Sequence, residues 1–225
     1  MVERHFDEDL TKLNTELLKM AALTEEAIYR SIEALQNKDD ALARSVIDND
    51  KQIDAMENII EEHAIELLAL RQPMAVDLRF ITTGMKINAE LERIADLAVN
   101  ISQRVIDLAG APLVKALIDL PRLSDIARKM VKGAIDAFVS GDPEKAEQVI
   151  FMDPAANKMK NLIVNELIYG YMVKDGTTAP RAVPLLLIAR HLERICDHAT
   201  NIAEDVVYMV NAKMVKHCKI DKKSA

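Results

Sequence analysis

Apolar residues recur every three or four positions along nearly the whole chain, which is the period of an amphipathic α-helix. Prolines, glycines and aspartates interrupt this pattern and supply the signals at which helices start and stop. The pattern predicts six helices, at about residues 5–36, 40–70, 75–108, 120–140, 143–172 and 180–217. Within the fifth helix we expect a kink or a restart at Asp153-Pro154, because a proline ring disturbs the preceding turn.

The connections between the predicted helices are short, so consecutive helices must fold back on one another. The sequence therefore predicts an all-α fold made of two tandem, pseudo-symmetric antiparallel three-helix bundles. We place the first bundle in residues 1–110 and the second in residues 111–225. Helices of this length imply an elongated molecule, since each residue adds about 1.5 Å.

The two halves share one motif, Leu-Glu-Arg-Ile-x-Asp-x-x-x-Asn-Ile, which begins at Leu91 and again at Leu192. Residues four apart lie on the same face of a helix, so each copy presents a column of oxygen-bearing side chains. The columns are Glu92, Asp96 and Asn100 in the first copy and Glu193, Asp197 and Asn201 in the second. The chain is therefore an internal duplication that carries candidate metal ligands twice.

A second acidic column faces the motif in the first half. If the second and third helices form a hairpin, residues equidistant from the turn lie side by side. Asp50 then pairs with Asp96 about a centre at residue 73. Asp54 pairs with Glu92 about the same centre, and Pro73 already marks the predicted turn. The sequence thus predicts four facing carboxylates on two adjacent helices.

The same construction holds in the second half. Asp153 pairs with Asp197, and Asn157 with Glu193, about a centre at Asp175 in the predicted turn. The second set has an amide where the first has a carboxylate, because Asn157 takes the place of an acid. We expect the second site to be weaker than the first or different from it.

Carboxylates in one patch repel one another, and a bound multivalent cation removes that repulsion. Arg93 and Arg194 each follow a motif Glu directly, so they should point roughly 100° away from it. Sites made only of oxygen ligands suit Mg, Ca, Mn and iron. The alternative is that these acids are ordinary exposed helix positions, which are common in a chain with 29% charged residues. Their recurrence at matched positions in both halves favours metal binding.

Charge and composition bear on nucleic-acid binding, on cellular location and on the state of the two cysteines. The net charge of −7 argues against nucleic-acid binding. The start of the chain lacks the apolar stretch of a secretory signal, and no apolar run is long enough to cross a bilayer, so we expect a cytoplasmic protein. Cys196 and Cys218 lack metal-type spacing and should be reduced thiols, with Cys196 in the core.

Known catalytic patterns are absent from the sequence. It contains no phosphate-binding glycine loop and no nucleophile elbow, so we do not expect an enzyme. A ferritin-like di-iron site requires Glu-x-x-His on two helices, and the spacing of His191 and His198 from Glu193 does not match it. We expect His63 and His198 to be ordinary surface or core-edge residues.

The duplicated motif, Leu91–Asp96 and again Leu192 through Glu204, resembles the PhoU family, the accessory regulators of bacterial phosphate-specific transport. The resemblance covers essentially the whole chain. It implies multinuclear metal clusters, with iron expected first and Mn, Zn, Mg or Ca as alternatives. The implied ligands are Asp50, Asp54, Glu92, Asp96, Asp153, Glu193 and Asp197. Asn157 departs from the acidic pattern, and Asn100 and Asn201 are either peripheral ligands or helix-surface amides.

The resemblance also implies a function. PhoU-like proteins are not enzymes but negative regulators of the phosphate-starvation response. They couple the ATPase subunit of the phosphate ABC transporter to the phosphate sensor histidine kinase, are often homodimers, and reach the membrane only through these partners. Two alternatives remain open: a metal storage or redox protein whose clusters are the function, and a helical scaffold without metal.

Overall fold

The protein is described here by a computed structural model that covers residues 2–110 and 112–213, with side chains from residue 6 onward. The predicted all-α fold is confirmed, and these residues contain no strand. The six α-helices are α1 (Val2–Asn37), α2 (Asp40–Arg71), α3 (Ala75–Asp107), α4 (Asp119–Ser140), α5 (Pro143–Asn165) and α6 (Ala179–Asn211). A π-helix, η1 (Glu166–Met172), and a 3₁₀ turn, η2 (Gly176–Thr178), lie between α5 and α6.

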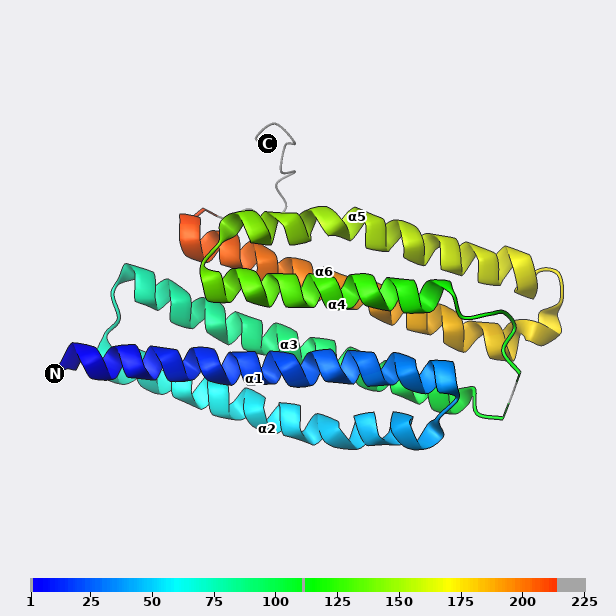
Figure 1. The fold of residues 1–225 in the computed structure, drawn as a ribbon, viewed down its shortest axis with the longest axis horizontal. Helices are drawn as coiled ribbons and strands as arrows, with labels where there is room; N and C mark the ends of the chain where they lie inside the picture. Colours follow the sequence, from blue (N-terminus) through cyan, green and yellow to red (C-terminus); the bar gives the residue numbers. More distant parts are fainter. Residues whose placement is uncertain (1, 111, 214–225) are drawn as a thin grey trace.

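The helices form two layers that each correspond to one half of the chain. All six lie roughly along the long axis of the molecule, with α1, α2 and α3 in one layer and α4, α5 and α6 in the other (Figure 1). Helices contact one another within each layer, and the layers are joined through α3 with α6 and α1 with α4. The predicted pair of three-helix bundles is therefore confirmed.

The helix ends follow the signals in the sequence, and they match between the halves. The carboxylate of Asp39 accepts a hydrogen bond from the Leu42 amide and caps α2. Asp142 caps α5 in the same way, by accepting from the amides of Glu144 and Lys145. These caps satisfy amides that the first helical turn leaves unpaired.

Two details of the predicted helices are wrong. Of the kink or restart predicted at Asp153-Pro154, the restart is wrong: α5 continues through Pro154, and the irregular turn is the π-helix near the end of the predicted segment. Helix α6 ends at Asn211 rather than at 217, because Ala212 adopts a left-handed conformation with φ of 53°. Residues 214–217 of that prediction, and Cys218, lie outside the described residues.

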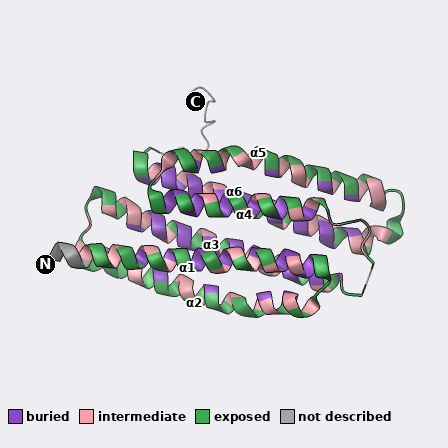
Figure 2. Ribbon diagram, viewed as in Figure 1, coloured by how far each residue is buried: buried purple, intermediate pink, exposed green. Residues whose placement is uncertain are grey.

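The core fixes which face of each motif helix is available for chemistry. Leu91 and Ile94 are fully buried on α3, as are Leu192 and Ile195 on α6, and the predicted burial of Cys196 is confirmed. Buried positions line the inward faces, whereas the outer faces of α2 and α5 are largely exposed (Figure 2). Burial of the apolar stripe turns the acidic column toward the neighbouring helix. In the described part of the chain, no helix combines the length and apolarity needed to cross a membrane.

Candidate metal centre

The first patch, as we call it, lies between α2 and α3 and consists of Asp50, Asp54, Glu57, Glu92 and Asp96. The predicted pairing is confirmed, because Asp96 acts electrostatically on Asp50 and Asp54 acts on Glu92. These pairs meet because α2 and α3 pack side by side as an antiparallel hairpin.

The carboxylates of the first patch do not ionise independently. Burial, together with the negative charges of Asp54 and Asp96, raises the pKa of Asp50 from 3.8 to about 6. Burial also raises the pKa of Glu92, and Asp96 adds to the effect. Asp50 and Glu92 therefore resist carrying a negative charge at this place. A cation at this place would relieve both effects.

Glu57 belongs to the first patch, although the sequence motifs did not predict it as a ligand. It lies one helical turn beyond Asp54, and its pKa is raised by burial and by the charges of Glu61, Asp54 and Asp96. The side chain of Asn88 on α3 donates to its backbone carbonyl at 2.9 Å. The spacing of three residues from Asp54 was the available signal, since such residues share a helix face.

Arg93 lies closer to this patch than its place in the motif predicts. Its guanidinium curls back to Glu92, with Nε 3.3 Å from Oε2, and to Asp96, with Nη1 3.6 Å from Oδ2. The prediction that Arg93 points away is wrong because the long side chain bends along the helix surface. However, this side chain is 64% exposed, so the ion pairs contribute little to stability.

The second patch lies between α5 and α6 and consists of Asp153, Asn157, Lys160, Glu193 and Asp197. Burial raises the pKa of Asp197 to about 6, with Glu193 and Asp153 contributing in the same direction. Burial also raises the pKa of Asp153, while a hydrogen bond with the side chain of Asn157 lowers it. The predicted carboxylates of this half therefore also lie together.

Lys160 was not predicted, and it changes the second patch. Its Nζ lies 3.2 Å from Oε1 of Glu193. The shift along the chain that relates the caps Asp39 and Asp142 also relates Glu57 to Lys160. An ammonium group thus stands in the second half where the first half has a carboxylate.

The ligand chemistry of the two patches differs accordingly. The first patch offers five carboxylates, which are the donors that hard cations and bridged iron favour. The second offers three carboxylates, an amide and an ammonium group. With the side chains as they lie, no three His, Cys, Asp or Glu residues in the described part of the chain converge closely enough to hold a metal ion. The first patch therefore suits a metal ion by its donor chemistry alone, and its side chains would have to move to coordinate one.

The two predicted ordinary histidines each pair with a carboxylate from another helix. His63 Nδ1 lies 2.8 Å from Oε2 of Glu16. His198 Nδ1 lies 2.5 Å from Oε2 of Glu90, across the contact between α3 and α6. The amide of Asn201 donates to Glu90 Oε1 at 3.3 Å, so this motif residue joins the two halves.

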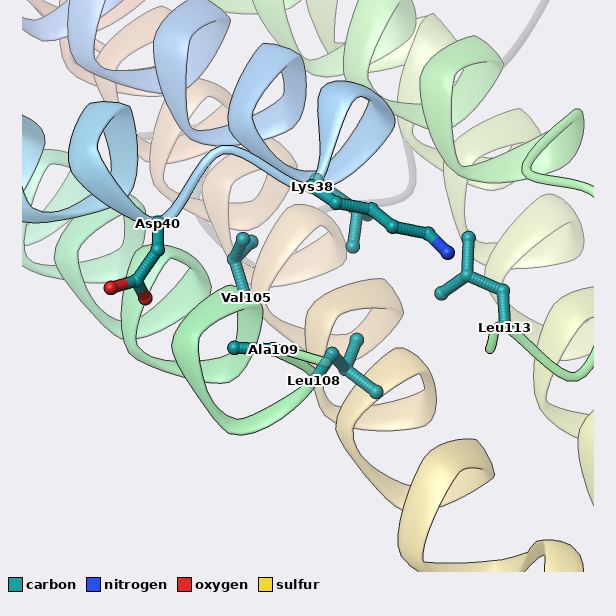
Figure 3. Close-up of a pocket in the computed structure, with 7 residues that line it drawn as sticks. Lys38, Asp40, Val105, Leu108, Ala109 and Leu113 are labelled. Carbon is teal, nitrogen blue, oxygen red and sulfur yellow. The ribbon is translucent and has the colours of Figure 1, made fainter. Parts of the chain in front are cut away.

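A small pocket elsewhere lies where the α1–α2 turn meets the connection after α3. Its lining is mainly apolar, and includes Val105, Leu108 and Leu113. Lys38 extends toward Leu113, whereas the carboxylate of Asp40 points away from these side chains (Figure 3). This arrangement offers no converging polar groups, so the acidic patches remain the candidate site.

The chain matches a known family in both halves. The family model described as PhoU domain matches twice, over residues 17–105 and 120–206. A phosphate-specific transport system accessory protein PhoU homolog from Zymomonas mobilis is 38% identical over 93% of this chain and 88% of its own length. The homolog of the same name from Rhizobium meliloti is 40% identical, over 91% and 86% respectively.

Solved structures agree with this match. The crystal structure of PhoU from Pseudomonas aeruginosa aligns with a TM-score of 0.88 and 34% identity, and covers 92% of this chain and 100% of that one. The phosphate transport system regulatory protein PhoU from Streptococcus pneumoniae aligns with a TM-score of 0.87 and 28% identity, over 93% and 99% respectively. Fold, duplicated motif and sequence identity over most of its length together show that this chain belongs to the PhoU family.

Proposed function

We propose that this protein is a negative regulator of phosphate uptake and of the phosphate-starvation response. In this role it acts as a metal-binding adaptor in the cytoplasm, between the ATPase subunit of the phosphate ABC transporter and the phosphate sensor histidine kinase. The observation that carries the proposal is the match, over about nine-tenths of the chain, to accessory proteins of phosphate-specific transport systems. The proposed role is regulatory and not catalytic.

The surface of the two bundles supports an adaptor with two related faces. Ile59 on α2 is 53% exposed and Leu162 on α5 is 61% exposed. The shift that relates Asp39 to Asp142 also relates these two residues, so each half presents an exposed apolar side chain at the same place on its outer helix. Exposed apolar groups beside charged ones suit a protein interface.

Metal binding is the second part of the proposal. Asp50, Asp54, Glu92 and Asp96 would hold the metal, with Glu57 within reach of the same place. Iron is the expected metal, with Mn, Zn, Mg or Ca as alternatives. A bound cation would neutralise the carboxylates and link α2 to α3. It would thereby stiffen the hairpin whose outer face meets a partner.

Deletion of the gene tests the regulatory role. A phosphate-regulated reporter should lose its repression in high phosphate in the deletion strain, and the wild-type gene should restore it. Full repression in the deletion strain would contradict the proposed function. The metal storage alternative predicts that outcome, together with a changed cellular metal content.

The adaptor role is tested with purified components. We expect the wild-type chain to bind both the transporter ATPase subunit and the kinase, and to be a homodimer by light scattering. The variant Asp96→Asn should weaken this binding in the presence of metal. Asp48→Asn is the matched control, because Asp48 is exposed on α2 outside the first patch. Equal weakening by both variants would show that the first patch has no special role.

A further inference from the structure

The two patches occupy equivalent places in the two halves but differ in charge. Counted from the sequence, the five carboxylates of the first patch give a formal charge of −5. The second patch has three carboxylates and one ammonium group, which leaves −2. Two substitutions at matched positions account for the difference: Asn157 stands at the place of Asp54, and Lys160 at the place of Glu57.

The ammonium group of Lys160 lies inside the second patch. Its Nζ contacts Glu193 at 3.2 Å, and the two side chains are only 18% and 17% exposed. Its positive charge also acts on Asp197, where it opposes the repulsion from Glu193 and Asp153. The positive charge of Lys160 therefore interacts favourably with two carboxylates of the patch, those of Glu193 and Asp197.

A metal ion and this ammonium group would compete for the same oxygens. An ion bound by Glu193 and Asp197 would lie next to Nζ, and two adjacent positive charges repel strongly away from bulk water. Asn157 supplies a neutral amide where the first patch has a carboxylate, so it adds little attraction for the ion. Asp153 Oδ1 is buried without a hydrogen-bond partner.

We propose that Lys160 is the built-in cation of the second patch, so that this patch takes no metal ion and the first patch alone binds metal. The inference rests on the proposed function only for metal binding at the first patch. The exclusion of metal from the second patch rests on the contact between Lys160 and Glu193, and it can be tested separately.

Calorimetric titration of the chelator-treated full chain with Mn²⁺ tests the exclusion. In the variant Asp54→Asn/Asp96→Asn we expect no Mn²⁺ binding, because only the second patch remains intact. Addition of Asn157→Asp and Lys160→Glu to that variant should create one new binding event. The matched control replaces Lys160→Glu with Lys158→Glu, which makes the same charge change at an exposed position on α5 and should create none.

Two results would overturn the inference. One is Mn²⁺ binding to Asp54→Asn/Asp96→Asn that Asp197→Asn abolishes. The other is the absence of new binding after Asn157→Asp and Lys160→Glu. Failure of wild-type protein to bind Mn²⁺ would instead contradict metal binding at the first patch, and the new site in the second patch would still decide the role of Lys160.

A measurement without metal complements the titration. In excess EDTA, Lys160→Met should lower the Tm of the full chain, whereas Lys158→Met should leave it nearly unchanged. The first variant removes the only ammonium group that contacts Glu193 among the described residues, and leaves the carboxylates of the patch unbalanced. Equal Tm values for the two variants would show that Lys160 does not balance the patch.

Discussion

The first and second patches lie on equivalent pairs of helices but differ in charge. Both lie where an outer helix, α2 or α5, packs against a motif helix, α3 or α6. Their caps and buried residues correspond, so the helices pack alike around the two patches, although η1 and η2 lengthen the turn between α5 and α6. The difference arises at Asp54 and Glu57, which become Asn157 and Lys160. If the first patch binds metal as we propose, the duplicated scaffold has retained its packing while the second copy has replaced a bound cation by the ammonium group of Lys160.

The largest effect is expected when the first patch is given the two residues that distinguish the second. The variant Asp54→Asn/Glu57→Lys adds three units of positive charge beside Glu92. At about 4 kcal/mol for each pair of unit charges near a protein surface, metal affinity should fall by at least about 100-fold. Mn²⁺ titration measures this effect. Retention of wild-type affinity would show that these two positions do not determine metal binding.

A smaller effect separates Lys160 from Arg93, the cation nearest the first patch. Lys160→Met should lower the free energy of unfolding by about 1 kcal/mol, because its ion pair is largely shielded from water. Arg93→Met should change it by less than about 0.5 kcal/mol, since its side chain is 64% exposed. Urea denaturation in EDTA measures both. A larger loss of unfolding free energy for Arg93→Met than for Lys160→Met would contradict the view that Lys160 is the more important cation.

Only part of the two patches could be predicted from the sequence. The facing pairs Asp50 with Asp96 and Asp54 with Glu92 were predictable, because hairpin partners lie equidistant from the turn at Pro73. Helix starts at Asp39 and Asp142 were predictable from local capping alone. Local signals of this kind determine most of the fold.

Lys160 and His198 required the three-dimensional structure. The contact of Lys160 with Glu193 depends on how a long, flexible side chain crosses between helices, which residue spacing does not specify. The pairing of His198 with Glu90 depends on the contact between the two halves. Residue positions within one predicted hairpin give no information about that contact. The left-handed Ala212 that ends α6 has no glycine or proline to mark it.

A further effect concerns the pH dependence of stability. Because burial and the neighbouring acids raise the folded-state pKa of Asp50 from 3.8 to about 6, the folded protein holds this proton more tightly than the unfolded chain. Stability of the metal-free protein should therefore increase as pH falls from about 6 to about 4. Asp197, with its pKa also raised to about 6, contributes with the same sign from the second patch.

Variants separate the two contributions to this pH dependence. Asp50→Asn and Asp197→Asn should each remove part of this gain in unfolding free energy, because each variant lacks a group that binds its proton more tightly in the folded state. Saturating Mn²⁺ should remove the Asp50 contribution and leave the Asp197 contribution intact. Urea denaturation at a series of pH values measures the difference. Loss of both contributions on addition of Mn²⁺ would place metal in both patches.

The central claim is that only one of two equivalent patches binds metal, and anomalous diffraction from crystals grown with Mn²⁺ tests it most directly. We predict anomalous difference peaks beside Asp50, Asp54, Glu92 and Asp96. We predict none beside Glu193 and Asp197, where the ammonium group of Lys160 should keep its contact with Glu193. A peak in the second patch, or none in the first, would contradict this account.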